Sequence, residues 1–398
     1  MKKRFQVVCL LVIVSLVLTS CWDRRELNDL AIVVGIGLDK KGSNIQVSAQ
    51  IVNPSEVASS KGGAGYSTPV SILTATESTI SEAIRKLSTI APRRIYSAHL
   101  RVLVIGEELA RQGIEKVMDG ISRNREFRSD FYLIIAKGTT AENVLGILMP
   151  TEKIPANKMY RTLDLSEKVW APTVKMPIDK ILSDLSNPTK DSVITGIQII
   201  GDQDIGKTKR NMNKSQAYAN LKFSGVAIFK QDKLIDWFNS EESKGYNYIM
   251  GNVKNSVGHL SCPQGGTLAV DVVRTKTSIK GEVVRGKPKI SVFLFSEEDV
   301  GEVQCKIDLT KMESIRQLEK LAEEKLTNIM EAAIQKAKKN KADIFGFGEA
   351  IEDVDPGSWK AISNEWDQSF ADLEVSVHVD VQIRRLGTIN NALLERKE

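Results

Sequence analysis

The chain has 398 residues, of which 42% are hydrophobic and 26% charged, and its formal net charge is +5. This balance is typical of a folded globular protein, and a chain of this length buries a sizeable core without disulfide staples. The composition therefore excludes an intrinsically disordered chain and a small disulfide-rich scaffold, and the length predicts two or three domains.

The N-terminus has the layout of a secretory signal peptide. Lys2, Lys3 and Arg4 precede an apolar run, Phe5–Leu18. This run is too short to span a membrane comfortably, which takes about 20 apolar residues. The stretch Leu18-Thr19-Ser20-Cys21 follows and resembles a bacterial lipobox. The sequence therefore predicts a lipoprotein leader at residues 1–20.

Lipidation would hold the mature chain at the outer face of a bacterial membrane. We expect cleavage after Ser20 and an S-diacylglyceryl group on Cys21. Two acyl chains give a stable anchor, at about 0.8 kcal/mol per buried methylene. The alternatives are an uncleaved N-terminal anchor and an ordinary signal peptide with an incidental cysteine. Because the leader carries three basic residues, its removal lowers the formal charge from +5 to +2. The mature chain is therefore only slightly basic, and we expect no nucleic-acid partner.

Residues 21–201 alternate strand and helix patterns, which predicts a mixed α/β region. The predicted strands are Leu30–Leu38, Ile45–Ile51, Leu100–Ile105, Phe131–Ala136 and Ser192–Ile200. The predicted helices are Ser78–Ser88, Glu107–Ile121 with a break near Gly113, and Thr140–Met149 with Thr139 or Thr140 as its cap. Between these elements, Asn53–Pro69 is rich in Ser and Gly and predicts a mobile loop. Pro150–Pro188 holds five of the 11 prolines and predicts an irregular wrap with short helices.

Residues 202–217 are polar and predict a linker or exposed loop, so that 218–398 forms a C-terminal α+β domain. The predicted strands there are Phe223–Phe229, Lys233–Trp237, Thr267–Lys280, Pro288–Phe295 and the final strand Leu373–Arg385. The predicted helices are Glu241–Met250, the long amphipathic Lys311–Lys339, and a shorter one carrying Trp359 and Trp366. We expect the apolar stripe of the long helix to cover its own sheet. The fold class is thus mixed α/β and α+β in several domains, with 21–201 open to a further division.

We found no motif for catalysis, a cofactor or a metal. There is no Walker loop, paired-histidine zinc helix or nucleophile elbow. Gly35-Ile36-Gly37 lacks the third glycine of a dinucleotide fingerprint, so it is interpreted as part of a strand. His99 and His259 have no ligand-spaced partner, and His378 lies on the polar side of the last strand. The sequence therefore predicts a protein that is not an enzyme.

Two further groups of residues allow alternatives. Cys262 and Cys305 are the cysteines that remain beyond Cys21, and we favour two free thiols over a disulfide. Basic residues cluster at Arg85, Lys86, Arg93 and Arg94 and again at Arg123, Arg125 and Arg128. These clusters either contact anionic lipid or an acidic partner, at about 1 kcal/mol per residue at a charged membrane, or are solvated helix ends and turns. We favour the solvated interpretation.

Four motifs, taken together, resemble the Ger(x)C family, the lipoprotein C subunits of nutrient germinant receptors in endospore-forming bacteria. The motifs are Cys21-Trp22-Asp23-Arg24-Arg25-Glu26-Leu27 with Gly35–Asp39; Pro92-Arg93-Arg94 with His99–Glu108; Ala136–Glu142; and Asp343-Ile344-Phe345-Gly346-Phe347-Gly348-Glu349, followed by Trp359, Trp366 and Ile383–Gly387. The resemblance covers essentially the whole mature chain. The loop 53–69 matches no motif of the family.

The resemblance implies a receptor built from two integral-membrane subunits, A and B, and this lipid-anchored one, in the inner membrane of the dormant spore. Small nutrients would trigger germination through it. The family's pattern supplies no catalytic residue, and only Cys21 carries over, as the lipidation site. The leading hypothesis is therefore a non-catalytic subunit that acts through contacts with the membrane subunits. The alternative is a solute-binding lipoprotein that captures the nutrient itself.

Overall fold

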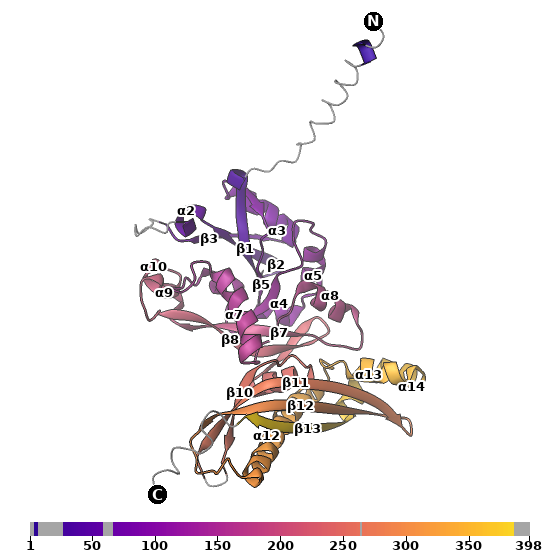
Figure 1. The fold of residues 1–398 in the computed structure, drawn as a ribbon. Helices are drawn as coiled ribbons and strands as arrows, with labels where there is room; N and C mark the ends of the chain where they lie inside the picture. Colours follow the sequence, from indigo (N-terminus) through magenta and orange to yellow (C-terminus); the bar gives the residue numbers. More distant parts are fainter. Residues whose placement is uncertain (1–3, 7–26, 59–66, 263–264, 386–398) are drawn as a thin grey trace.

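The computed structural model describes residues 4–6, 27–58, 67–262 and 265–385. Within these ranges the strands form two sheets, one of nine strands in the order β3-β2-β1-β5-β6-β7-β8-β9, with β4 beside β1, and one of four strands in the order β10-β11-β12-β13. Figure 1 shows the larger sheet with its helices in the upper part and the smaller sheet with α12 in the lower part. The predicted mixed α+β class is therefore correct.

The centre of the nine-stranded sheet is parallel and buried. Its four parallel strands are β1 (Leu30–Lys41), β5 (Val102–Gly106), β6 (Tyr132–Ala136) and β7 (Val193–Gly201). The antiparallel strands on either side are β2 (Asn44–Val52), β3 (Val70–Glu77), β8 (Ala219–Lys230) and β9 (Lys233–Phe238), and β4 (Arg94–Tyr96) pairs with β1 in parallel. Continuous apolar runs such as Val102–Gly106 fit a parallel strand that helices cover on both faces.

Helices cover the two faces of this sheet, and alternate residues of each strand reach opposite layers. Leu103 and Ile105 pack with one layer, while Val102 and Val104 pack with the other. The first layer holds α3 (Ile80–Lys86), α4 (Glu107–Gln112), α5 (Glu115–Ser122) and α8 (Ile178–Ser186). The second holds α6 (Ala141–Gly146) and α7 (Pro155–Val169). The 3-10 turns η1 (Leu27–Asp29) and η2 (Leu87–Thr89) complete the region.

Two segments differ from the sequence-based prediction. Pro150–Pro188 is not an irregular wrap, because it contains the 15-residue helix α7 as well as α8. Pro155 stands at the first position of α7, where a missing N–H costs nothing because the first-turn N–H groups have no partner in the helix. The predicted loop Asn53–Pro69 begins with the short helix α2 (Pro54–Ala58), and its residues 59–66 lie outside the described chain.

The polar segment 202–217 joins two neighbouring strands of one sheet. It forms α9 (Gln203–Gly206) and α10 (Lys209–Met212), and β8 then pairs antiparallel with β7. The buried Asn211 fixes this return, because its Nδ2 donates to the Leu148 carbonyl at 2.5 Å and its Oδ1 accepts the Ala219 N–H at 2.9 Å. The strands β8 and β9, which we assigned to the C-terminal domain 218–398, therefore lie in the first sheet, and the sheets separate after Phe238.

The second sheet is built from two long strands and two shorter ones. Its strands are β10 (Ser256–Ser261), β11 (Thr267–Val284), β12 (Lys287–Val303) and β13 (Glu374–Arg385). The connection from β12 to its parallel neighbour β13 contains α12 (Met312–Lys339), α13 (Phe347–Val354), α14 (Pro356–Ile362), η3 (Ser363–Glu365) and α15 (Trp366–Asp372). As predicted, α12 packs its apolar stripe against β13 and the rest of its own domain.

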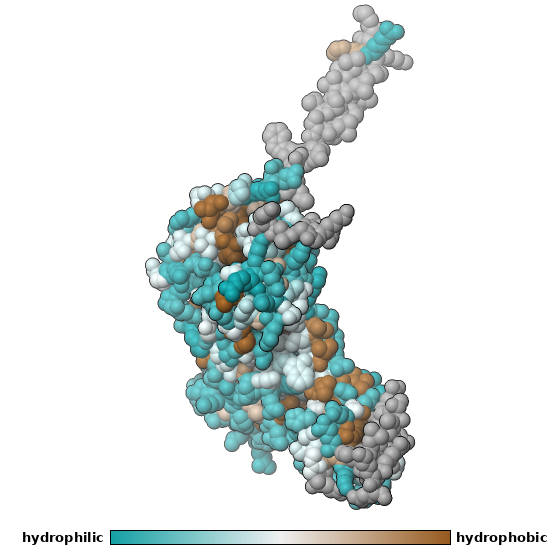
Figure 2. Space-filling view, turned by 90° about the vertical axis from the view of Figure 1, so that its left-hand side faces the viewer, coloured by the Kyte–Doolittle hydropathy of each residue, from teal (hydrophilic) through white to brown (hydrophobic). Residues whose placement is uncertain are grey.

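The helix α11 (Ser240–Ile249) joins the two sheets into one continuous core. A capping box of Asn239 and Glu242 begins it. A Cβ on Gly245 would lie 2.1 Å from the carbonyl oxygen of Ile329, so the backbones of α11 and α12 touch at this glycine. The buried Asn247 donates to the carbonyls of Ala171 and Thr173 at 2.7 and 3.0 Å. The face shown in Figure 2 is mainly hydrophilic, with separate hydrophobic patches on both parts of the molecule.

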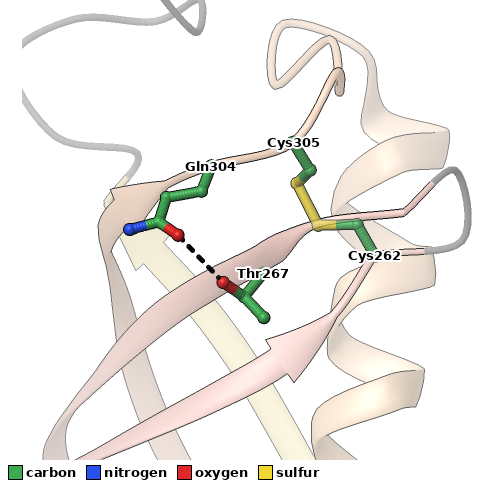
Figure 3. Close-up of a disulfide and its surroundings, with 4 residues drawn as sticks. All are labelled: Cys262, Thr267, Gln304 and Cys305. Atoms are coloured by element: carbon green, nitrogen blue, oxygen red, sulfur yellow. Dashed lines mark hydrogen bonds between the residues drawn. A yellow bond between two sulfur atoms is a disulfide. The ribbon is translucent and has the colours of Figure 1, made fainter.

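The expectation of two free thiols is wrong, because Cys262 and Cys305 form a disulfide with a Cα–Cα distance of 6.4 Å (Figure 3). Cys262 follows β10 and Cys305 follows β12, and these strands flank the start of β11, where the Gln304 N–H donates to the Thr267 carbonyl at 2.8 Å. A Cβ on Gly266 would lie 3.1 Å from the Cβ of Cys305. The missing side chain at Gly266 leaves room for the bridge. The spacing of the two cysteines in the sequence does not predict this pairing, because strand pairing brings them together.

Removal of this disulfide should lower the stability of the chain. It closes a loop with a sequence separation of 43, and the loop-closure model assigns about 4 kcal/mol to a loop of this size. We expect Cys262→Ala/Cys305→Ala to unfold at lower urea concentration than the oxidised wild type. Equal midpoints for the two proteins, or free thiols at Cys262 and Cys305 when unreduced wild type is alkylated and its peptides are mapped, would contradict the bridge.

Candidate functional site

The residues that the sequence singled out do not gather into a catalytic or metal centre. Cys21 lies outside the described residues, so the structure does not show its position. His99 packs edge-on to Tyr96, and His378 stacks on Phe293 on the open face of the second sheet. Among residues 27–58, 67–262 and 265–385, no three metal-ligating side chains converge. His259 instead lies at the rim of a pocket described below.

The Gly35-Ile36-Gly37 segment is a strand, as interpreted. A Cβ on Gly35 would lie 2.8 Å from a methyl carbon of Leu145, and a Cβ on Gly37 would lie 3.0 Å from Ala141. The two glycines thus let α6 lie directly on β1. Asp39, at the end of this motif, accepts the N–H groups of Ala141 and Glu142 at 2.8 and 3.0 Å. The motif is therefore a packing and capping device rather than a nucleotide site.

The side chain of Asp343 stabilises the turn that its motif, Asp343–Glu349, forms at the start of α13. Its Oδ1 accepts the N–H groups of Gly346 and Phe347, each at 3.0 Å, and its Oδ2 accepts the Gly348 N–H at 2.8 Å and the Trp366 Nε1–H at 3.0 Å. The side chain is 2% exposed. Burial raises the pKa of Asp343 to about 6, although all four donors favour the ionised carboxylate.

The glycines of this motif have separate structural roles. Gly346 has φ of 74°, in the left-handed region that favours glycine. A Cβ on Gly348 would lie 2.8 Å from the ring of Trp359 and 3.0 Å from Nε1 of Trp366. The tryptophans can pack on this turn only because position 348 has no side chain. The motif therefore holds the C-terminal helices together.

Substitution of Asp343 tests this network. Asp343→Asn retains one acceptor oxygen but turns an NH₂ group towards two N–H donors, and each buried unsatisfied donor costs about 1–3 kcal/mol. The variant should therefore unfold at lower urea concentration than the wild type.

The pH dependence of the same comparison has a definite sign. Because the folded-state pKa of Asp343 is raised from 3.8 to about 6, the folded chain binds more protons at this group than the unfolded chain in that window. The stability advantage of wild type over Asp343→Asn should shrink as pH rises from 3.8 to about 6. Urea unfolding across this range measures it, and an advantage that grows with pH would mean that the pKa is lowered instead.

The two basic clusters come together at one end of the first sheet. All of their residues except Lys86 and Arg128 line a hollow of about 1110 Å³, which we call the arginine cup. Its arginines come from the end of α3, from the start of β4 and the residue before it, and from the segment after α5, and they are Arg85, Arg93, Arg94, Arg123 and Arg125. Asn28 and Asp29 of η1 also line it. The cup therefore lies where the described chain resumes at Leu27.

A second hollow, of about 180 Å³, is lined by α11, α12, strands of the second sheet and Trp170, which follows α7. We call it the Glu298 pocket, because Glu298 lines it and is only 1% exposed. The Oε1 of Glu298 accepts the Ser296 hydroxyl at 3.0 Å, while Oε2 has no hydrogen-bond partner among the described residues. Burial raises the pKa of Glu298.

The rim of the Glu298 pocket carries cations and an aromatic ring. Lys244 lies 3.6 Å from the centroid of the Trp170 ring, and its Nζ donates to the Val257 carbonyl at 3.4 Å. Lys325 donates to the His259 carbonyl at 2.7 Å. The pocket thus presents an unpaired buried carboxyl oxygen inside and ammonium groups outside, which suits a small molecule with a hydrogen-bond donor. No sequence motif signals this site, because its residues come from distant segments.

Models of two families match the chain in succession. The family described as "Spore germination protein N-terminal domain" matches residues 23–199, and "Spore germination B3/ GerAC like, C-terminal" matches residues 224–387. The chain therefore belongs to the GerAC-like family of spore germination proteins. The family resemblance predicted from the motifs is thus confirmed.

Relatives match over nearly their whole length. Spore germination protein KC of Bacillus subtilis (strain 168) is 34% identical, with 97% of each chain covered. Spore germination protein YndF of the same organism is 27% identical, with 96% of each chain covered. The crystal structure of the GerBC protein superimposes with a TM-score of 0.57 at 20% identity, covering 91% of this chain and 99% of the other. The last comparison shows that the fold is shared. In the part of the chain described, none of the helices has the length and apolar character needed to cross a membrane.

Proposed function

We propose that the protein is a lipid-anchored, non-catalytic subunit of a spore nutrient germinant receptor. The observation that carries this proposal is the family match over both halves of the chain. It is supported by relatives named as spore germination proteins, which align with this chain over nearly their whole length. The lipobox-like Leu18-Thr19-Ser20-Cys21 supports attachment to the outer face of the spore inner membrane. The subunit would act through protein contacts with the integral-membrane A and B subunits.

The geometry of the chain entry supports such an attachment. In Figure 1 the described chain enters β1 at the upper end of the first sheet, away from the second sheet. A lipid on Cys21 would therefore hold the molecule by one end. Restriction to the membrane raises the effective concentration of membrane partners, so that modest interfaces suffice for assembly. The buried motifs at Asp39 and Asp343 are structural, and this agrees with a role in binding rather than catalysis.

Substitution of the predicted lipidation site tests the anchor. Cys21→Ala removes the thiol that would carry the diacylglyceryl group, so we expect loss of acylation, release from the membrane fraction and impaired nutrient-triggered germination. The matched control is Cys9→Ala, which removes a cysteine of the leader and should leave all three properties unchanged. Mass spectrometry of the N-terminal peptide, membrane fractionation and spore germination assays measure them.

Two outcomes would contradict the anchor. One is an intact leader or an unmodified Cys21 in the mature wild-type protein from its native host. The other is normal membrane retention together with normal germination in Cys21→Ala. Retention with lost germination would point to a different means of attachment and leave the receptor role standing.

A second candidate function, capture of a small solute, rests on the Glu298 pocket. Its orphan Oε2 inside and its ammonium groups at the rim favour a small ligand that carries both a donor and an anionic group. The two sheets differ in size and strand order, so the molecule does not have two similar lobes around a cleft. The pocket is accordingly the feature that supports capture.

Calorimetry with amino acids and sugars tests the capture function. If the pocket binds one of them through Glu298, the heat signal should be lost in Glu298→Gln, which keeps the size of the side chain but removes its charge. Lys280→Ala, a substitution outside the pocket lining, is the control and should bind as the wild type does. No heat of binding for any of these solutes would remove the support for this function.

A further inference from the structure

The arginine cup, we propose, binds the phosphate headgroups of anionic phospholipids, so that this end of the molecule lies on the membrane surface. The inference deepens the proposed function and rests on it for the position of the anchor. Its first support is the arrangement of charge. Five arginines and two carboxylates, those of Asp29 and Glu126, line the hollow. Such an excess of guanidinium groups in one concave surface favours phosphate, which arginine binds through paired N–H groups.

Three of the five arginines are available for a ligand. Arg94 pairs with Glu126 at 2.7 Å, and Arg123 pairs with Asp119 at 2.8 Å. The remaining three are exposed and have no ion pair with any described residue, and they are Arg85, Arg93 and Arg125. If these arginines were only solvated helix ends and turns, we would expect them to be scattered over the surface. These three come from separate segments and line the same hollow.

The cup also lies beside the predicted anchor. Asn28 and Asp29 line it, and Cys21 is only six residues before Leu27. Six residues reach at most about 20 Å when fully extended. Acyl chains on Cys21 would therefore keep the cup close to the bilayer, where the negative surface potential of anionic lipids acts within about 10 Å at moderate salt.

An exposed apolar side chain lies next in sequence to the cup. Ile90 is 54% exposed, and its neighbours Ala91 and Pro92 line the hollow. A basic surface with an apolar side chain beside it matches the composition of segments that bind at the bilayer interface, where cations meet headgroups and apolar groups enter the acyl boundary. This points to a lipid surface rather than to an acidic protein.

The partner chemistry is tested without the anchor. The sample is the mature chain 21–398 with Cys21→Ser, which cannot be acylated at that position. The leader is dispensable for the core, because the buried side chains of the described chain begin at Leu30. Cosedimentation is measured with vesicles of phosphatidylcholine alone and with vesicles that also contain phosphatidylglycerol. We expect binding to the second kind only, and weaker binding as salt is raised.

The test variant is Arg85→Ala/Arg93→Ala/Arg125→Ala. Because each arginine near an anionic surface contributes about fivefold in partitioning, the variant should bind on the order of 100-fold more weakly. The control is Lys276→Ala/Arg285→Ala/Lys287→Ala, which removes three exposed cations from the β11–β12 hairpin of the other sheet and should bind as the parent does. Urea midpoints equal to that of the parent would show that both variants fold.

Three outcomes would overturn the inference. They are no binding of the parent to anionic vesicles, equal binding to both kinds of vesicle, and equal losses in the test and control variants, which would show a general charge effect. None of them depends on acylation of Cys21. Failure of the cup and failure of the lipid anchor are therefore distinguishable.

Discussion

The buried carboxylate of Asp343 is the interaction on which the junction of the two parts depends. Its four N–H donors fix the turn before α13 and the position of Trp366. Its own backbone carbonyl accepts the Asp191 N–H at 2.9 Å, next to the start of β7 in the first sheet. Glu349, one turn into α13, accepts Asn187 Nδ2 at 2.7 Å and lies 3.3 Å from Lys190 Nζ. Without these N–H donors, burial of the charged Asp343 carboxylate at this junction would be strongly unfavourable.

The same junction explains why the core does not divide between the sheets. The helix α11 leaves β9 of the first sheet and packs its backbone on α12 of the second, with Gly245 at the contact. The side chain of Asn247 then donates hydrogen bonds to two carbonyl groups of the segment after α7. Buried polar groups of this kind are satisfied only in one arrangement, so they specify how the two parts meet. The Glu298 pocket lies beside this meeting point, since Trp170 after α7 lines it together with α11, α12 and the second sheet.

Local patterns in the sequence predict the elements, and long-range pairing decides the rest. The alternation of valines in β13 and the break at Gly113, which has φ of 134°, are visible in the sequence and occur in the structure. The sequence does not show that β8 and β9 belong to the first sheet, because strand pairing depends on which strand the chain folds back to lie beside. The residue types of the arginine cup were apparent, but Arg85 and Arg125 meet only through the fold. The helix α7 was not predicted, because Pro155 opens it and a proline in the first turn begins a helix as readily as it disrupts one.

Attachment by one end and recognition by one surface have different physical effects. The proposed lipid tether on Cys21 would fix how far Leu27 can move from the bilayer, but it would leave the molecule free to turn about that point. If the arginine cup binds headgroups as proposed, its cations would add a preferred orientation, because other orientations would move them out of the surface potential. The local concentration of headgroups at the end of a tether is high, so weak individual contacts suffice. The first sheet would then face the membrane and its integral subunits, while the second sheet, with its disulfide and its pocket rim, would face away.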